Sequence, residues 1–205
     1  MGIDPGTTRT GYGVLEVDGG SGGGRLYAVT LGDIDLRRER DTYQKLRVIF
    51  ERVCELVDSY HPDEVALESP FFGENVQSML KLGRAQGVAM AAALSRGLPV
   101  YEYAPRRVKQ AITGQGAAAK EQVAAMLGSM LGIEYNPRRL DATDGMAVAL
   151  CHHFMSSSAR ILGAATSGAA GAVSGSGTAS VKKTRGQSVS SWEDFLRQNP
   201  GREVK

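Results

Sequence analysis

The sequence is poor in the residues that mark several large classes of protein. It has two cysteines, one tryptophan and three histidines among 205 residues. Cys54 and Cys151 are too few for the disulfide framework of a small secreted protein, so we expect both to be reduced core residues. The histidines have neither metal-ligand spacing nor a thiol partner, which excludes a zinc site, and we interpret His152 and His153 as residues near the end of a helix.

Long apolar segments are missing as well. No stretch of about 18 apolar residues occurs, and this excludes a membrane-spanning helix. The first residues contain no basic segment followed by an apolar one, as a secretion leader would. Together with the reduced cysteines, these absences predict a cytoplasmic protein without membrane contact.

Charge of one sign is not in excess over the whole chain, whose net charge is +2, but it is unevenly distributed. Residues 1–154 hold 17 Lys and Arg against 19 Asp and Glu, a net charge of −2. Within them, residues 81–139 hold nine basic and three acidic residues, a net charge of +6. A basic stretch inside an acidic body predicts a phosphate-binding face. The alternative is an ordinary solvated surface.

The hydrophobic pattern predicts an α/β domain. Three strands in a meander come first, with a Gly-rich hairpin tip at residues 19–24, and helices then alternate with two further strands. Such an order favours a mixed five-stranded sheet flanked by helices, the ribonuclease-H-like arrangement. The expected strands are 2–4, 11–17, 26–34, 65–68 and 99–104, and the expected helices are 42–60, 76–96, 105–112, 118–131 and 140–154.

The composition changes after Phe154. Of the 18 residues 163–180, all but Val173 are Gly, Ala, Ser or Thr, a composition that buries too little apolar surface to offset its ordering entropy. We therefore expect a folded domain at residues 1–155 and a flexible linker with a short tail at 156–205. The segment Ser191–Leu196 resembles one capped turn of helix, which is either a docking peptide or a tail without a function of its own.

Four acidic residues stand where predicted elements end or begin. Asp4 ends a buried strand and Glu68 ends another, while Asp141 and Asp144 share one face at the start of a helix. Singly, each has an ordinary explanation as a turn former, a strand end or a helix cap. Packed together, the carboxylates would repel one another unless cations neutralised them, and oxygen ligands without Cys or His select Mg²⁺ or Mn²⁺.

Several motifs in fixed order then resemble the RuvC family of Holliday-junction endonucleases over roughly residues 1–154. They are Gly-Ile-Asp4-Pro-Gly-Thr with Gly11-Tyr-Gly, Glu68 followed by Phe71-Phe72 and Asn75, Leu80-Lys-Leu-Gly-Arg-Ala-Gln-Gly-Val88, Pro99-Val-Tyr-Glu-Tyr, Val108-Lys109-Gln110, Gly114-Gln-Gly, Lys120, and Asp141-Ala-Thr-Asp144. The resemblance implies a crossover junction endodeoxyribonuclease that acts in recombination and repair. It implies a homodimer that nicks two opposing strands symmetrically, and as partners a junction-binding protein and a ring ATPase for branch migration.

Roles carried over by position complete this hypothesis. Asp4, Glu68, Asp141 and Asp144 would be catalytic residues holding Mg²⁺, with Mn²⁺ as a substitute and two ions in each active site. Lys109 and Lys120 match basic residues near the scissile phosphate, and Lys120 counts among the catalytic residues. Phe71 matches an aromatic that the family inserts into DNA near the crossover, and the less favoured alternative is a core residue beside Phe72. Further DNA-binding candidates are Lys81, Arg84, Arg106 and Arg107.

A ridge of small residues at Gly83, Gly87 and Ala91 recurs at positions i, i+4 and i+8 of the second helix. Such a ridge lets another helix approach closely, either within the chain or across a dimer seam.

Three alternatives to a junction nuclease share parts of the pattern. An actin-like or sugar-kinase ATPase also uses Asp-Pro-Gly-Thr before a hairpin, but it needs a second such hairpin, which we do not find. A junction-binding module without catalysis would have no need of all four acids. A ribonuclease acting on RNA–DNA hybrids shares the acids but does not explain the motif at residues 80–88.

Overall fold

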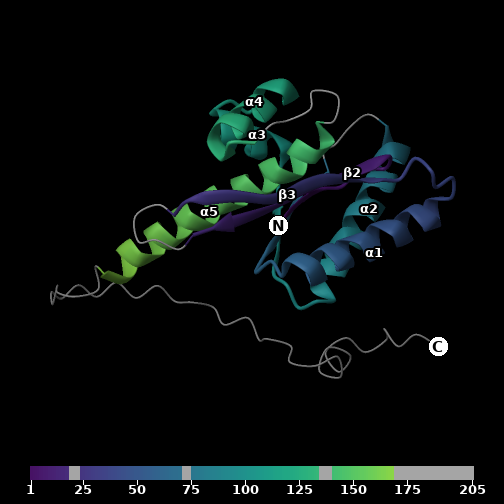
Figure 1. Cartoon of the computed structure of the whole chain (residues 1–205), viewed down its shortest axis with the longest axis horizontal. Coiled ribbons are helices and arrows are strands. Elements are labelled where there is room, and N and C mark those ends of the chain that lie inside the picture. Colours follow the sequence, from purple (N-terminus) through teal and green to yellow (C-terminus); the bar gives the residue numbers. More distant parts are fainter. Residues whose placement is uncertain (19–23, 71–74, 134–139, 169–205) are drawn as a thin grey trace, which may run out of the picture. The chain divides into compact units, whose positions relative to one another are not determined.

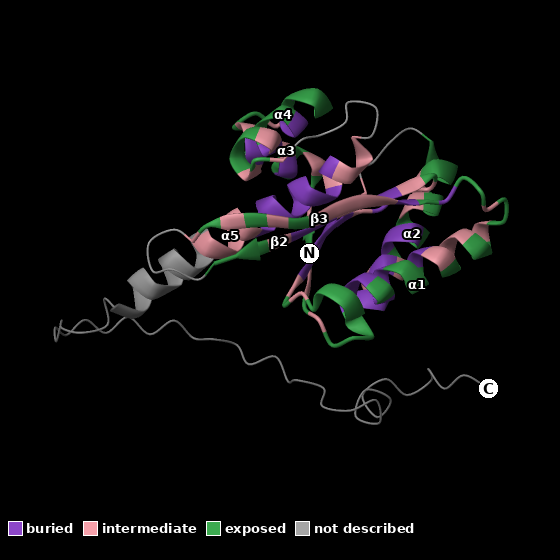
Figure 2. Cartoon of the chain, in the orientation of Figure 1, coloured by how far each residue is buried: buried purple, intermediate pink, exposed green. Residues whose placement is uncertain are grey.

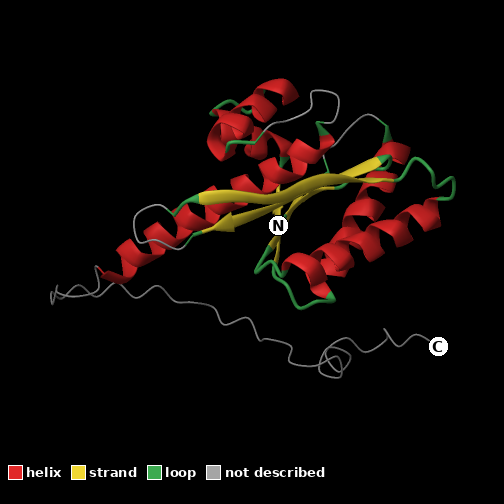
Figure 3. Ribbon diagram, in the orientation of Figure 1, coloured by secondary structure: helices red, strands yellow, loops and turns green. Residues whose placement is uncertain are grey.

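The structure is a computed structural model of the chain. It describes residues 1–18, 24–70, 75–133 and 140–168. Residues Met1–Ser167 form one compact unit. The strands are β1 (Gly2–Asp4), β2 (Arg9–Val17), β3 (Leu26–Asp35), β4 (Val65–Glu68) and β5 (Val100–Tyr103). The helices are α1 (Thr42–Tyr60), α2 (Val76–Leu94), α3 (Pro105–Thr113), α4 (Lys120–Leu131) and α5 (Asp141–Gly168) (Figures 1 and 3).

The five strands form one mixed sheet in the order β3-β2-β1-β4-β5. β1, β2 and β3 are antiparallel neighbours, whereas β4 is parallel to both β1 and β5. The predicted mixed sheet of five strands is thereby confirmed. Because β1 and β4 run in the same direction, their carboxyl ends, Asp4 and Glu68, lie at the same edge of the sheet.

The helices cover the two faces of the sheet separately (Figure 1). Buried side chains of α1 and α2 pack against Ile3, Val65 and Leu67. Buried side chains of α3, α4 and α5 form a second core that includes Ala66. Since neighbouring residues of a strand point to opposite faces, Asp4 and Glu68 belong to the face that carries Ala66 and α5. Figure 2 shows the buried residues between these layers.

Most of the predicted bounds are confirmed within one or two residues, and α1 coincides with the range 42–60. Its first turn is capped by Asp41, whose side chain accepts a hydrogen bond of 3.1 Å from the amide of Gln44. It ends at His61, which adopts the left-handed conformation with φ 45°. The expected hairpin tip lies mostly outside the described residues.

The predicted end of the last helix near residue 154 was wrong, because α5 continues to Gly168. The sequence from Met155 to Ala165 contains no proline, and its one glycine, Gly163, lowers the helix propensity without stopping a helix that has already formed. His152 and His153 therefore lie within the helix rather than near its end. No helix among the described residues is long and apolar enough to cross a bilayer.

Helix α5 approaches the sheet at backbone distance, and glycines make this possible. A Cβ atom at any of four glycines would overlap the backbone opposite. A Cβ added at Gly2 would lie 2.3 Å from the backbone nitrogen of Ala149, and one at Gly11 would lie 1.9 Å from the backbone oxygen of Asp141. A Cβ added at Gly13 would lie 2.6 Å from the Cα of Met146, and one at Gly145 would lie 2.4 Å from the Cα of Tyr12. The contact fixes the first turn of α5 on β1 and β2.

The Gly145→Ala variant should lose stability, because its methyl group would meet the backbone of Tyr12 and push α5 away from the sheet. We expect the free energy of unfolding to fall by about 1–3 kcal/mol, measured by urea denaturation. Ser129→Ala, at an exposed position of α4, is the control. It should be neutral or stabilising by up to about 0.5 kcal/mol, because alanine has the higher helix propensity. Equal stability of the two variants would contradict the proposed contact.

Candidate active site

Three elements bring the four predicted acids to one edge of the sheet. β1 supplies Asp4, β4 supplies Glu68, and the first turn of α5 supplies Asp141 and Asp144. Each of the four is at least partly exposed to solvent. Asp141 and Asp144 stand at a helix N-terminus, where unpaired backbone N–H groups favour negative charge.

The charges of these carboxylates act on one another. Burial, reinforced by the charges of Glu68, Asp144 and Asp141, raises the pKa of Asp4 to about 8. Burial and the charge of Asp144 raise the pKa of Glu68 to about 7. The pKa of Asp144 is raised as well, first by burial and then by Asp141, although Lys120 works against both. The acids thus form one electrostatic cluster.

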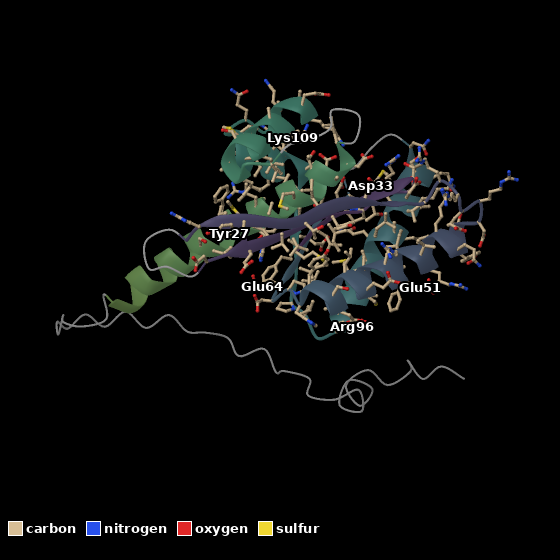
Figure 4. The ribbon with its side chains drawn as sticks, in the orientation of Figure 1. Tyr27, Asp33, Glu51, Glu64, Arg96 and Lys109 are labelled. Carbon is tan, nitrogen blue, oxygen red and sulfur yellow. The ribbon has the colours of Figure 1, made fainter. Side chains whose placement is uncertain are left out.

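Two predicted lysines supply positive charge to this cluster. Lys120 Nζ donates a 2.5 Å hydrogen bond to Asp144 Oδ2. Burial acts to lower the pKa of Lys120, but this bond and the charges of Asp4 and Asp141 outweigh it, so the pKa is raised. Lys109, labelled in Figure 4, lies near enough for its charge to lower the pKa values of Glu68 and Asp144.

The four carboxylates are not arranged around one common metal position in this structure. Among the described residues, no three Asp, Glu, His or Cys side chains stand close enough together to hold one metal ion. In this arrangement Lys120 holds Asp144, and Arg9 Nε lies 3.8 Å from Asp141 Oδ2. The donor set of four carboxylates suits a hard divalent cation by its chemistry, and two of its members are in contact with cationic side chains.

The other predicted DNA-binding residues lie around this cluster or apart from it. Arg106 and Arg107 are exposed on α3, the helix that also carries Lys109. Lys81 and Arg84 are exposed on α2, which covers the opposite face of the sheet from α5. Phe71 lies outside the described residues.

Sequence reasoning missed a cation on the other side of the cluster. Arg9, at the start of β2, donates from Nη1 to Asp33 Oδ2 at 2.5 Å while its Nε faces Asp141. The only sequence signal is that Arg9 follows the Asp4 turn. Its link to Asp33 depends on the pairing of β2 with β3, which the sequence pattern does not specify.

It also missed a polar network around the buried ring of His152. His152 Nε2 lies 2.6 Å from Glu64 Oε2, and its Nδ1 shares a 2.8 Å hydrogen bond with the hydroxyl of Tyr103. The ring of Tyr101 lies 4.5 Å from that of His152 between centroids. These contacts join α5 to β4 and β5, and Figure 4 labels Glu64.

The raised pKa values predict how stability depends on pH in the metal-free protein. Asp4 and Glu68 have folded-state pKa values of about 8 and about 7, above their ordinary values of 3.8 and 4.5. The contribution of these two groups to stability is therefore fully present at a pH below their ordinary pKa values, and it is lost as the pH rises through their folded-state pKa values. The Asp4→Asn variant cannot ionise, so it should unfold at a higher temperature than the unmodified chain at alkaline pH.

The measurement is thermal unfolding in the presence of EDTA at about pH 5 and about pH 8.5. The unfolding temperature of Asp4→Asn should exceed that of the unmodified chain by more at the higher pH, and this difference is the advantage of the variant. Asp58→Asn is the control. The hydrogen bond from Arg96 lowers the pKa of Asp58, so that variant should gain nothing at alkaline pH. An advantage of Asp4→Asn that shrinks toward alkaline pH would contradict the electrostatic account.

Known proteins resemble this chain along most of its length. The family model described as "Crossover junction endodeoxyribonuclease RuvC" matches residues 1–152. A protein of that name from Bacteroides fragilis is 50% identical over 204 residues, covering 98% of this chain and 94% of the relative. One from Christiangramia forsetii is 48% identical over 200 residues, covering 98% of this chain and 90% of the relative.

Solved structures agree with this likeness. Thermus thermophilus RuvC is 35% identical with a TM-score of 0.68, covering 77% of this chain and 95% of that one. The same protein in complex with a Holliday junction substrate is 36% identical with a TM-score of 0.68, covering 76% of this chain and 92% of that one. This agreement favours the nuclease hypothesis over the ATPase alternative. The chain belongs to the RuvC family of crossover junction endodeoxyribonucleases.

Proposed function

We propose that this chain is a structure-specific endonuclease that resolves four-way DNA junctions during homologous recombination and repair. It hydrolyses a phosphodiester bond in each of two opposing strands. The observation that carries this proposal is the electrostatic cluster of Asp4, Glu68, Asp141 and Asp144 in a chain of the RuvC family. A solved relative in complex with a Holliday junction supports the choice of substrate.

The four acids would hold Mg²⁺, with Mn²⁺ as a substitute and two ions in each active site. Carboxylate oxygens without sulfur or imidazole ligands favour these hard cations. When bound, the metal supplies an activated water and stabilises the leaving oxygen of the cut strand. Lys120 holds one oxygen of Asp144 in the metal-free protein. When the acids hold the ion, this lysine would release Asp144 and would be placed to contact the scissile phosphate.

DNA contacts would come from basic side chains near the acids. The charges of Lys109 and Lys120 act on the acids, and Arg106 and Arg107 extend the positive charge along α3. Lys81 and Arg84 would reach a more distant part of the junction, since α2 covers the other face of the sheet. Phe71 directly follows the segment that carries Glu68, and we propose that it contacts bases near the crossover.

A two-fold dimer through α2 would place two acid clusters on one junction. Gly83, Gly87 and Ala91 are exposed, and no atom lies within 4 Å of a Cβ at either glycine. The ridge is therefore not used for packing by the residues that the structure describes. Apolar side chains flank it, since Val76, Leu80 and Leu94 are 64%, 53% and 58% exposed. A symmetric seam explains both features, and symmetry supplies two related cuts.

The remaining parts of the hypothesis concern partners and the tail. We propose that the dimer works in the cytoplasm with a junction-binding protein and a ring ATPase that drives branch migration. We also propose that the nuclease domain of residues 1–155, extended by the rest of α5, is sufficient for cutting. The linker and tail would then serve other contacts.

Each of the variants Asp4→Asn, Glu68→Gln, Asp141→Asn and Asp144→Asn should abolish cutting of a synthetic four-way junction while junction binding is kept. The acids hold metal, whereas phosphate contacts come from Lys and Arg. Gel assays of nicking and of binding measure the two properties separately. Asp58→Asn, which removes an exposed acid paired with Arg96, should cut normally. Loss of binding together with cutting in all four variants would overturn the assignment.

The Gly87→Leu variant should weaken the dimer. A leucine in the seam would hold the two copies of α2 apart, at a cost of about 1–3 kcal/mol. Light scattering at micromolar concentration measures the molar mass, and paired nicking measures the consequence. Ala125→Leu adds the same side chain at an exposed position of α4 and should remain dimeric. If Gly87→Leu stays dimeric and makes paired nicks, the seam lies elsewhere.

A further inference from the structure

Two cations flank the acid cluster, and they are held in different ways. Lys120 is 53% exposed and hydrogen-bonds to a member of the cluster, Asp144. Arg9 is 21% exposed, and it bonds to Asp33, a carboxylate outside the cluster whose side chain is 2% exposed. If Asp144 turned toward another ligand, Lys120 would lose that bond. The bond of Arg9 to Asp33 does not depend on any of the four acids.

The sheet register explains the place of Arg9. Asp33 pairs with Gly11 across β2 and β3, and Arg9 lies two residues before Gly11. All three therefore share the face on which Asp141 rests against Gly11. Figure 4 shows Asp33 toward the opposite end of the β2–β3 hairpin from Tyr27. The guanidinium is thus fixed between a buried partner and Asp141, whose carboxylate lies 3.8 Å from Nε.

We propose that Arg9, anchored by Asp33, is a fixed positive charge beside Asp141 that weakens metal binding in the DNA-free protein. This inference rests on the proposed metal site. A positive charge a few ångströms from a divalent ion opposes its binding, and partial exposure reduces this effect without removing it. A DNA phosphate brings the opposite charge. The metal site would therefore fill most readily when a junction is already bound.

A purely structural ion pair between β2 and β3 makes a different prediction. Such a pair would contribute to stability, but its removal would leave the affinity for metal unchanged. The affinity of the free protein for Mn²⁺ therefore separates the two roles without any measurement of cutting.

The experiment measures Mn²⁺ binding to the full chain without DNA, by electron paramagnetic resonance. Asp33→Asn keeps the charge of Arg9, and the double variant Arg9→Met with Asp33→Asn removes it together with the charge of its buried partner. The double variant should bind Mn²⁺ about tenfold more tightly than Asp33→Asn, since one neighbouring charge at partial exposure is worth on the order of one factor of ten. Arg9→Lys keeps the charge and should stay within about threefold of the unmodified chain.

Glu68→Gln tells failure of this inference apart from failure of the proposed function. If Glu68→Gln loses Mn²⁺ binding while the double variant binds no more tightly than Asp33→Asn, the role of Arg9 is overturned and the metal site stands. If neither the unmodified chain nor the double variant binds Mn²⁺, or if Glu68→Gln binds it as tightly as the unmodified chain, the proposed metal site fails and the inference fails with it. If the double variant binds Mn²⁺ more tightly than Asp33→Asn and Glu68→Gln loses Mn²⁺ binding, the result supports both the role of Arg9 and the proposed metal site.

Discussion

The site depends on the backbone contact between α5 and the sheet. Because Gly11 and Gly145 lack side chains, the first turn of α5 packs directly on the backbone of β2. The carbonyl oxygen of Asp141 lies where a Cβ of Gly11 would be. Asp141 and Asp144 thereby reach the edge of the sheet at which β1 and β4 end with Asp4 and Glu68. A helix held off by ordinary side chains would leave its acids several ångströms away.

This geometry has an electrostatic cost that the protein offsets only in part. Burial and mutual repulsion raise the pKa values of Asp4 and Glu68 far above those of ordinary carboxyl groups. Lys109, Lys120 and Arg9 supply one positive charge each against four carboxylates. The folded chain therefore favours the binding of further cations at the cluster of four acids. Groups poised in this way are characteristic of functional sites rather than of structural cores.

Much of this could be predicted from the sequence, and the reasons are local. The bounds of α1 followed from its apolar spacing, and the acids were found because each ends or begins an element. The length of α5 was not predicted, because its alanine- and glycine-rich continuation resembles a linker in composition. The partnership of Arg9 with Asp33, and that of His152 with Glu64, depend on strand register and helix placement. These are properties of the whole fold that no short segment displays.

The most direct test of the account is a crystal structure of the full chain with Mn²⁺, in which anomalous scattering locates the ion. The account predicts manganese between the carboxylates of Asp4, Glu68 and the first turn of α5, at oxygen distances of about 2.0–2.3 Å. It also predicts that Lys120 no longer contacts Asp144. Manganese bound elsewhere, or an undisturbed pair of Lys120 and Asp144 in protein that cuts junctions under the same conditions, would contradict it.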